Sequence, residues 1–408
     1  MRIVEKSMKL VTLRALLFAR ARNSRTRTIE PCPGDHPWRF QLMKTVIVGG
    51  GILGTALAYR LSTEGVEVEL FEAGQIGAGT SMVGTGWFNS GGKEPYEYHL
   101  LNVSGMAEHA TVAREFGYSP WYHADGNLEW ATPEKADKLA AHVERLRSWG
   151  YPAELLSPKR IKEIEPYLSI PGEVDKIAYY PWEGMSDLPQ LIGELAHRAA
   201  ANGAAIHTNT PVESVTTEGD RVTGVVLLNG TTISADVVAI CTGRWSDEVV
   251  KSAGVQLPMA PSLGFNIYTG PSPIVLKAFV HTPDVNLRPE GAGRVLARSP
   301  EFDNSVAIDA ALDPIPDVGK EILARAVKYL PGLDGAAIEG ARVAYRSIPG
   351  DSHPVIGQVP GREGLYLMVT HSGGTLGPLL GRLAASEIAH GELDSRLSLF
   401  RPERIVTV

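Results

Sequence analysis

The hydrophobic pattern of residues 45–72 predicts a strand, a tight turn, a helix and a second strand. The run 45–48 is β-branched and apolar, which favours a buried strand, and three glycines follow it. The next apolar positions share one face of a helix: Leu53, Ala56, Leu57 and Leu61. Residues 66–72 then predict a second, parallel strand. This order is that of a β-α-β unit.

The rest of the chain divides into helical and extended patterns. Helical periodicity and start or stop signals predict helices over 97–117, 133–149, from 157 onward, 188–199, 318–330 and 378–390. Apolar or alternating runs predict strands at 205–208, 221–228, 231–233, 236–241 and 364–370. Residues 260–312 predict an antiparallel sheet with strands at 265–268, 274–280, 285–288, 293–298 and 305–309.

Residues 73–95 are dense in glycine and small polar side chains, and they show neither a helical nor a strand period. A loop this long inside a compact domain is uncommon unless it is functional. We therefore expect Thr80 and Ser81 to bond polar atoms of a ligand, and Trp87, Phe88 and Asn89 to lie near the reacting group.

Composition narrows the class of protein. The chain has 408 residues, which favours two domains, and its 44% hydrophobic and 21% charged residues are ordinary for a globular enzyme. No apolar run approaches the length of a membrane span. Two cysteines, Cys32 and Cys241, indicate a reducing compartment, and their spacing suggests no metal site. We therefore expect a cytoplasmic protein without a metal.

Charge is distributed unevenly along the chain. The net charge is −7, and residues 1–42 hold nine Lys/Arg and three Asp/Glu, so the remainder carries −7 − 6 = −13. An acidic body argues against nucleic acid as a partner. The basic segment 1–42 has two interpretations, a mitochondrial presequence or an appendage before a natural start at Met43, and we favour the second. Either way, we expect this segment to be poorly ordered and to carry no chemistry.

Three glycines give the β-α-β unit its chemistry. Gly49, Gly51 and Gly54 occupy the G-x-G-x-x-G positions, where they allow a sharp turn, close approach of a pyrophosphate and tight helix packing. The helix directs its free N–H groups at the phosphates. Glu72, at the tip of the second strand, is placed to bind a ribose 2′-OH and to repel a 2′-phosphate. NADP is therefore disfavoured, whereas NAD and FAD both remain open.

Three further motifs bear on the choice of nucleotide. Residues 241–246 read CTGRWS after the apolar strand, residues 344–357 contain R-x-x-P-x-D-x-x-P-x-I-G, and residues 370–378 read THSGGTLGP ahead of the last helix. Together with the glycine turn, they resemble the motifs of the FAD-dependent D-amino-acid oxidase superfamily, which includes glycine oxidase and sarcosine oxidase. The likeness spans residues 43–395, and it is strong around the nucleotide and weak elsewhere.

This resemblance implies an α/β fold with a discontinuous Rossmann-type FAD-binding domain and a second α+β domain built on an antiparallel sheet. The FAD domain would comprise 43–95, 183–258 and 343–408, and the substrate domain 96–182 and 259–342. The implied FAD contacts are Gly49, Gly51, Ile52, Leu53, Gly54, Glu72, Ala73, Thr80, Ser81, Val212, Thr242, Gly243, Trp245, Gly373, Gly374, Thr375 and Leu376. N–H groups at the start of the last helix would stabilise negative charge on the flavin, which favours FAD over NAD.

The resemblance also implies a substrate site. Arg346 occupies the position that binds a substrate carboxylate in glycine oxidase-like members, and we add Asn286 and His371 as candidate catalytic residues. No cysteine near Arg346 matches the one that tethers flavin in sarcosine oxidase-like enzymes, so FAD should be bound non-covalently. Asn286 replaces a tyrosine and Ser372-Gly373 replaces a second arginine of glycine oxidase-like members, so we expect a substrate other than simple glycine.

We therefore expect oxidation of an amino acid or N-substituted amino acid to an imine, with hydride transfer to flavin N5. The expected partners are this small molecule and an electron acceptor, either O₂ or a quinone or other acceptor, and an oligomer is compatible with the sequence. Two alternatives stay open. One is a flavin-binding subunit of a hetero-oligomeric amine or imino-acid dehydrogenase, and the other is an NAD-dependent dehydrogenase.

Overall fold

The computed structural model describes residues 43–408, so the predictions for residues 1–42 lie outside the described residues. The first sheet has the strand order β21 (Val355–Gln358), β22 (Leu365–Val369), β13 (Val237–Ile240), β1 (Lys44–Val48), β2 (Glu67–Phe71) and β9 (Ala205–His207). Its neighbours run parallel except β21, which is antiparallel to β22. The predicted β-α-β unit is confirmed.

Alternation along the strands gives this sheet two apolar faces. Ile47 contributes to one core with α2 (Ile52–Thr63), α7 (Leu188–Ala201) and α10 (Gly373–His390). Val46 and Val48 face the opposite core. That core is closed by the antiparallel strands β10 (Val212–Glu218), β11 (Arg221–Leu227) and β12 (Thr232–Ser234), and by α8 (Ser246–Val250). The predicted hairpin between β11 and β12 is confirmed, whereas β10 was not predicted.

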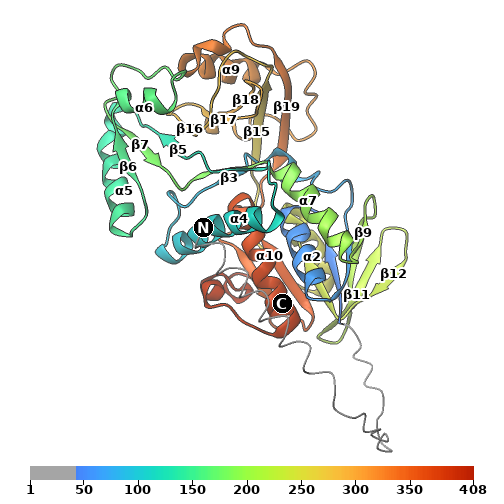
Figure 1. Cartoon of the computed structure of the whole chain (residues 1–408). Coiled ribbons are helices and arrows are strands. Elements are labelled where there is room, and N and C mark those ends of the chain that lie inside the picture. The colour runs from blue at the N-terminus through green and yellow to red at the C-terminus, as the bar shows by residue number, and fades with distance from the viewer. Residues whose placement is uncertain (1–42) are drawn as a thin grey trace, which may run out of the picture. The chain divides into compact units, whose positions relative to one another are not determined.

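Helix α2 lies between α7 and α10, and α4 (Tyr96–Phe116) packs on α10 (Figure 1). The prediction that the last helix begins at Pro378 was wrong, because it begins at Gly373 and Pro378 lies inside it. Proline lacks the N–H that would bond the carbonyl of residue 374. The Gly374 carbonyl instead accepts a hydrogen bond from His109 Nε2, at 2.8 Å, so the helix tolerates the proline.

The second sheet has the order β19 (Ile338–Tyr345), β15 (Leu263–Thr269), β18 (Val295–Arg298), β17 (Asn286–Pro289), β16 (Phe279–His281), β5 (Asn127–Glu129), β7 (Ile177–Tyr180) and β6 (Glu154–Leu156). All neighbours are antiparallel except β16 and β5, which are parallel. Strands from 96–182 and 259–342 thus share one sheet. The grouping of these segments into a substrate domain stays a prediction.

Helix α9 (Asp317–Tyr329) covers this second sheet, as Figure 1 shows, and α5 (Ala136–Ser148) and α6 (Pro158–Ile164) pack beside β6 and β7. Two predicted strands were partly or wholly wrong. Within residues 274–280, the strand begins only at Phe279. Ile274 and Leu276 lie before it and are buried in the core, which explains their apolar character. Residues 305–309 form turns, in which Val306 alone is buried.

The segment 73–95 holds more structure than its composition indicated. It contains the short helix α3 (Thr80–Val83) and strand β3 (Trp87–Phe88), which pairs with β8 (Gly184–Ser186). Strand β8 also pairs with β4 (Tyr122–His123), and β14 (Met259–Ala260) pairs with β20 (Ile348–Pro349). Short 3-10 turns lie at Pro133–Lys135, Gly243–Trp245, Lys251–Ala253, Pro300–Phe302, Pro331–Leu333, Ser395–Phe400 and Pro402–Arg404.

Two kinds of feature are absent from residues 43–408. No helix there combines the length and the apolar character needed to cross a membrane. The same residues contain no group of three or more His, Cys, Asp or Glu side chains that could hold a metal ion.

Candidate active site

A cavity of about 730 Å³ opens at the carboxyl ends of β1, β2 and β13, where Val48, Phe71 and Cys241 line it. It continues past the first turns of α2 and α10 to the second sheet, where Asn266 and Arg298 line it. In open α/β sheets, ligands bind outside the carboxyl ends of the strands. The position and size of the cavity therefore suit an extended nucleotide with room for a second molecule.

The predicted cofactor residues gather around this cavity. The following line it: Gly49, Gly51, Ile52, Leu53, Glu72, Ala73, Thr80, Ser81, Val212, Thr242, Gly243, Trp245, Gly373, Gly374 and Thr375. Gly54 and Leu376 do not. Gly54 is buried inside α2, and Leu376 is buried inside α10. Their predicted role as direct contacts of FAD stays a prediction, whereas their packing positions the two helix starts.

The glycine turn between β1 and α2 cannot carry side chains. Gly49 has φ +104°, and a Cβ atom there would lie 2.6 Å from the Cys241 carbonyl oxygen. A Cβ atom on Gly54 would lie 1.9 Å from the Gly49 carbonyl oxygen. Helix α2 starts after Gly51, which has no side chain to cap it, so the positive end of its dipole meets the cavity. This arrangement fits a pyrophosphate.

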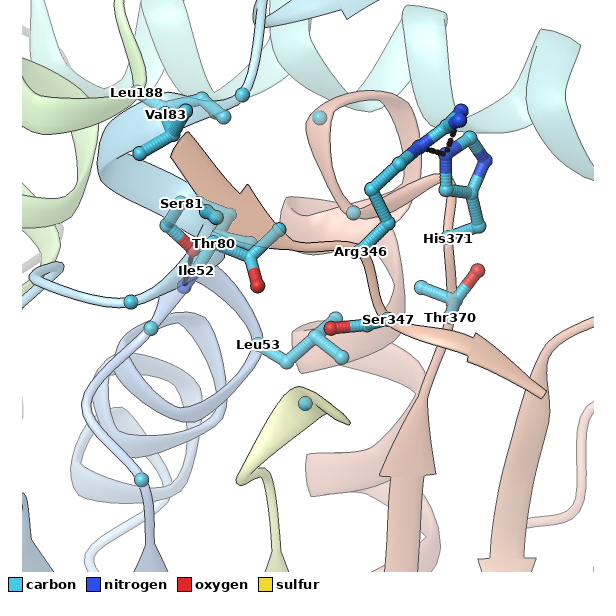
Figure 2. A pocket seen from close by; sticks show the side chains of 18 of the residues that line it. Ile52, Leu53, Thr80, Ser81, Val83, Leu188, Arg346, Ser347, Thr370 and His371 are labelled. Carbon is cyan, nitrogen blue, oxygen red and sulfur yellow. Dashed lines mark hydrogen bonds between the residues drawn. The ribbon is translucent and has the colours of Figure 1, made fainter. Parts of the chain in front are cut away.

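Glu72 lies just beyond the end of β2, where both of its carboxylate oxygens are fixed. Gly50 N–H donates to Oε2 at 2.7 Å and Gly74 N–H donates to Oε1 at 2.8 Å. A carboxylate has about four lone-pair sites, so further acceptor capacity remains for ribose hydroxyls. Figure 2 shows α3 beside the start of α2, and there the Ser81 hydroxyl accepts the Ile52 N–H at 3.2 Å.

The start of α10 forms the opposite wall. Its N-cap residue, Ser372, does not cap the helix with its side chain. The Ser372 hydroxyl instead bonds Lys93 Nζ at 3.0 Å and Tyr98 Oη at 2.7 Å. The helix start at Gly373 and Gly374 therefore meets the cavity with its positive dipole end, which suits a ring that gains negative charge.

Arg346 follows β19 and reaches the cavity beside His371 (Figure 2). Its Nη2 and Nε donate to His371 Nε2 at 2.8 and 3.2 Å, and its Nη1 donates to Asp303 at 3.1 Å. The pKa of His371 is lowered to about 3 by burial and by the positive charges of Arg346, Lys93 and Arg298. His371 is therefore a neutral acceptor for the guanidinium at any working pH.

Of the three candidate catalytic residues, Arg346 and His371 line the cavity and Asn286 does not. Asn286 lies on β17, directly opposite Arg298 on β18. Directly opposite residues point to the same face of a sheet, so Asn286 shares the face of a cavity-lining arginine. Its catalytic role stays a prediction.

Several residues that we did not single out from sequence belong to the site. Asn266 is 3% exposed, lines the cavity and leaves its Oδ1 atom without a partner among the described residues. Arg298 lines the cavity and pairs with Asp303, which also accepts from Arg346. These residues come from the second sheet and its following turn. Their positions depend on the pairing of distant strands, so no local sequence motif predicts them.

Comparisons with known proteins agree with this geometry. The family model described as FAD dependent oxidoreductase, DAO, matches residues 44–387. The chain is 26% identical to glycine oxidase of Geobacillus kaustophilus, over 87% of this chain and 95% of that protein. It is also 26% identical to glycine oxidase of Pseudomonas putida, over 80% and 89% of the respective chains.

Solved structures give the same fold. The crystal structure of glycine oxidase from Geobacillus kaustophilus matches with a TM-score of 0.79 at 25% identity, covering 88% of this chain and 98% of that one. That of L-proline dehydrogenase from P. horikoshii matches with a TM-score of 0.78 at 23% identity, over 89% and 97%. The cofactor is therefore FAD, and the NAD alternative is wrong. This chain belongs to the FAD dependent oxidoreductase family DAO and is an FAD-dependent oxidoreductase.

Proposed function

We propose that this enzyme oxidises the C–N bond of an amino acid or N-substituted amino acid to an imine, which water then hydrolyses. Bound FAD supplies the acceptor for the hydride that leaves the substrate carbon. The relatives named above support this reaction class, since both are amino-acid oxidases by name. The residues of this chain bind the substrate carboxylate, set the protonation state of the amine and line the reaction cavity.

The geometry of Arg346 carries the proposal. A guanidinium has five N–H donors, and three of them point to His371 and Asp303. The remaining 5 − 3 = 2 donors have no partner among residues 43–408. The side chain is 27% exposed, and it lines the cavity that the start of α10 also lines. A substrate carboxylate fits these two donors, because carboxylate and guanidinium match as a planar pair.

The charges around the cavity favour the amine in its reactive, neutral form. Lys93, Arg298 and Arg346 line the cavity, and a protonated amine would be repelled by all three. His371 is not required as a general base, because its Nε2 atom already accepts from Arg346. We infer that the substrate releases its ammonium proton to solvent on binding, so that hydride loss from the neutral amine gives the protonated imine without a further base.

Substrate oxidation is tested by mixing the purified holoenzyme anaerobically with a panel of amino acids and N-alkyl amino acids. Loss of the yellow flavin colour with members of this panel, and not with amines lacking a carboxylate, is expected. Arg346→Met should raise KM for the best substrate about 10- to 100-fold, because a charge-assisted pair is lost. Arg346→Lys should recover part of this loss.

Arg294→Met is the matched control, because Arg294 immediately precedes β18, pairs with Glu339 and does not line the cavity. Its KM should equal that of the wild type. An unchanged KM in Arg346→Met would refute the carboxylate role of Arg346.

We propose that reduced FAD is reoxidised by O₂ or by a quinone or other acceptor, and that the enzyme acts in the cytoplasm. Reoxidation of the bleached enzyme on admission of air, compared with a quinone added anaerobically, distinguishes the acceptors.

A further inference from the structure

The substrate end of the cavity carries more positive than negative charge. Three cationic side chains line it, Lys93, Arg298 and Arg346, and they come from three separate segments of the chain. Asp303 pairs with both arginines. Lys93 forms no ion pair with a described residue. Among the described residues, Lys93 is therefore the one of these three cations without a direct ion-pair partner.

Lys93 is held there by neutral groups. Its Nζ donates to the Ser372 hydroxyl at 3.0 Å and lies 5.7 Å from the centre of the Tyr98 ring. An ammonium group has three donors, so two remain for a ligand. The pKa of Lys93 is lowered to about 8 by burial and by Arg346, against the opposing effect of Glu183. An anion beside Lys93 would stabilise its charged form.

The loop that carries Lys93 is fixed by a buried carboxylate. Glu183 is fully buried, and it accepts the Ser90 and Gly91 N–H groups at 3.2 and 2.8 Å. The same carboxylate also accepts from Tyr151 Oη at 3.0 Å, and from the Trp87 and Asn127 side chains at 3.1 Å each. The position of Lys93 is therefore set before any ligand arrives, which lowers the entropy that binding would cost.

Arg346 and Lys93 lie near the same histidine, because the positive charges of both lower the pKa of His371. Arg346 is held by His371 and Lys93 by Ser372, and these are consecutive residues, whose Cα atoms lie about 3.8 Å apart. Both cations therefore reach the cavity beside one turn of the chain. A molecule that places one anionic group on Arg346 can extend a second one toward Lys93.

We propose that Lys93 binds a second carboxylate of the substrate, so that the substrates are dicarboxylic amino acids, such as N-carboxyalkyl amino acids. This inference rests on the proposed function, in which Arg346 holds the first carboxylate. A dianion with a neutral amine places one carboxylate beside Arg346 and the other beside Lys93. A monocarboxylate substrate would leave the partly buried Lys93 ammonium without a direct ion-pair partner among the described residues, at an electrostatic cost.

The test measures binding of ligands that cannot be oxidised at a C–N bond. Thiodiacetate and (methylthio)acetate differ only in the second carboxylate, and each is titrated calorimetrically into the FAD-loaded full chain. Thiodiacetate should bind at least about tenfold more tightly, as expected for one charge-assisted contact. Lys93→Met should abolish that advantage and leave the affinity for (methylthio)acetate within about twofold.

Matched variants separate this role from others. Lys93→Arg should keep part of the preference for thiodiacetate, and Lys138→Met, at an exposed lysine of α5, should change nothing. The visible spectrum and melting temperature of each variant show whether FAD and fold are retained. Where Lys93→Met does not fold, Lys93→Gln replaces it.

The proposal is overturned by equal affinity of the wild type for both ligands. It is also overturned if Lys93→Met weakens the binding of both ligands equally. A shift of the flavin reduction potential in place of the lost preference would overturn it too, since Lys93 would then act on the cofactor. Failure of the proposed function looks different. In that case Arg346→Met leaves the binding of both ligands unchanged, or no amino acid in the panel bleaches the flavin.

Discussion

At the scale of single residues, the site shows how neighbouring charges decide what a side chain can do. His371 lies beside the cavity, where an imidazole commonly serves as a base. Here its pKa is lowered to about 3, and its Nε2 atom accepts two donors of Arg346. We therefore expect His371 to orient the guanidinium and not to exchange protons during turnover.

His371→Leu should raise KM for the carboxylate substrate about tenfold and change kcat by less than about threefold, because Arg346 loses an acceptor that holds it. The shape of the kcat/KM profile between about pH 5 and 9 should match that of the wild type, since His371 stays neutral throughout. His371→Gln, which keeps an acceptor, is the conservative comparison. Loss of an ionisation from the profile in His371→Leu would show that the imidazole titrates.

At the scale of elements, two helices meet through a glycine. A Cβ atom on Gly381 of α10 would lie 2.6 Å from the carbonyl carbon and Cβ of Ala56 in α2. Gly193 of α7 is a contrasting helical glycine, because it is exposed and a Cβ there would meet nothing within 4 Å. Both glycines are helical, but only Gly193 has room for a methyl group.

Gly381→Ala should lower the free energy of unfolding by about 1–3 kcal/mol, since the helices must separate. Gly193→Ala should raise it by about 0.5–1 kcal/mol, because alanine favours the helix. Urea unfolding of both variants measures these changes. Destabilisation of equal size in both would mean that the α2–α10 contact does not decide the effect.

The contact between α4 and α10 predicts a dependence of stability on pH. His109 is fully buried and donates to the Gly374 carbonyl, and burial lowers its pKa to about 4. The unfolded chain binds this proton below about pH 6.5, whereas the folded chain resists it. The stability contribution is therefore complete above about pH 6.5 and is lost as the pH falls toward 4. The full loss is on the order of 3 kcal/mol.

His109→Gln isolates this term, because a neutral amide can donate to the same carbonyl without titrating. Urea unfolding from pH 7 to 4.5 measures the free energy of unfolding of both proteins. Any excess of the wild type over the variant should shrink or change sign as the pH is lowered. Parallel curves for the two proteins would refute the assignment.

Local sequence patterns predicted some elements well, because there the local preference for helix or strand is the same as the structure that the tertiary packing requires. The glycine turn and its flanking apolar runs specify β1, α2 and β2 whatever lies around them. The start of α10 was mispredicted because Pro378 normally marks a boundary, and only the His109 side chain, far away in sequence, satisfies the freed carbonyl. Arg298 reaches the cavity through the pairing of distant strands, and Asp303 pairs with Arg298 and Arg346 from the turn after β18, so no spacing rule could indicate them.

At the scale of the whole molecule, FAD is expected to hold separate segments together. Its predicted contacts come from the first strands, α3, β10, the turn after β13 and the start of α10. A ligand that binds the folded state alone stabilises it by about 2.7 kcal/mol at a hundredfold excess over Kd. The chain without FAD should therefore melt at a lower temperature than the holoenzyme.

Melting curves of the FAD-free chain at rising FAD concentration test this, and the melting temperature should climb steadily. Arg346→Met should show the same rise, because Arg346 is assigned to the substrate and not to FAD. A melting temperature that does not change with the FAD concentration would argue against binding of FAD across these segments.

The strand orders also bear on how the polypeptide is made. In the first sheet β13 lies between β1 and β22, and in the second β15 lies between β18 and β19. The second sheet cannot be completed until β19 (residues 338–345) has been synthesised, and the first not until β21 and β22 (residues 355–369) have been. Such non-local pairing slows folding. Until then the nascent chain exposes unpaired strand edges, and chaperone protection during synthesis matters most in that interval.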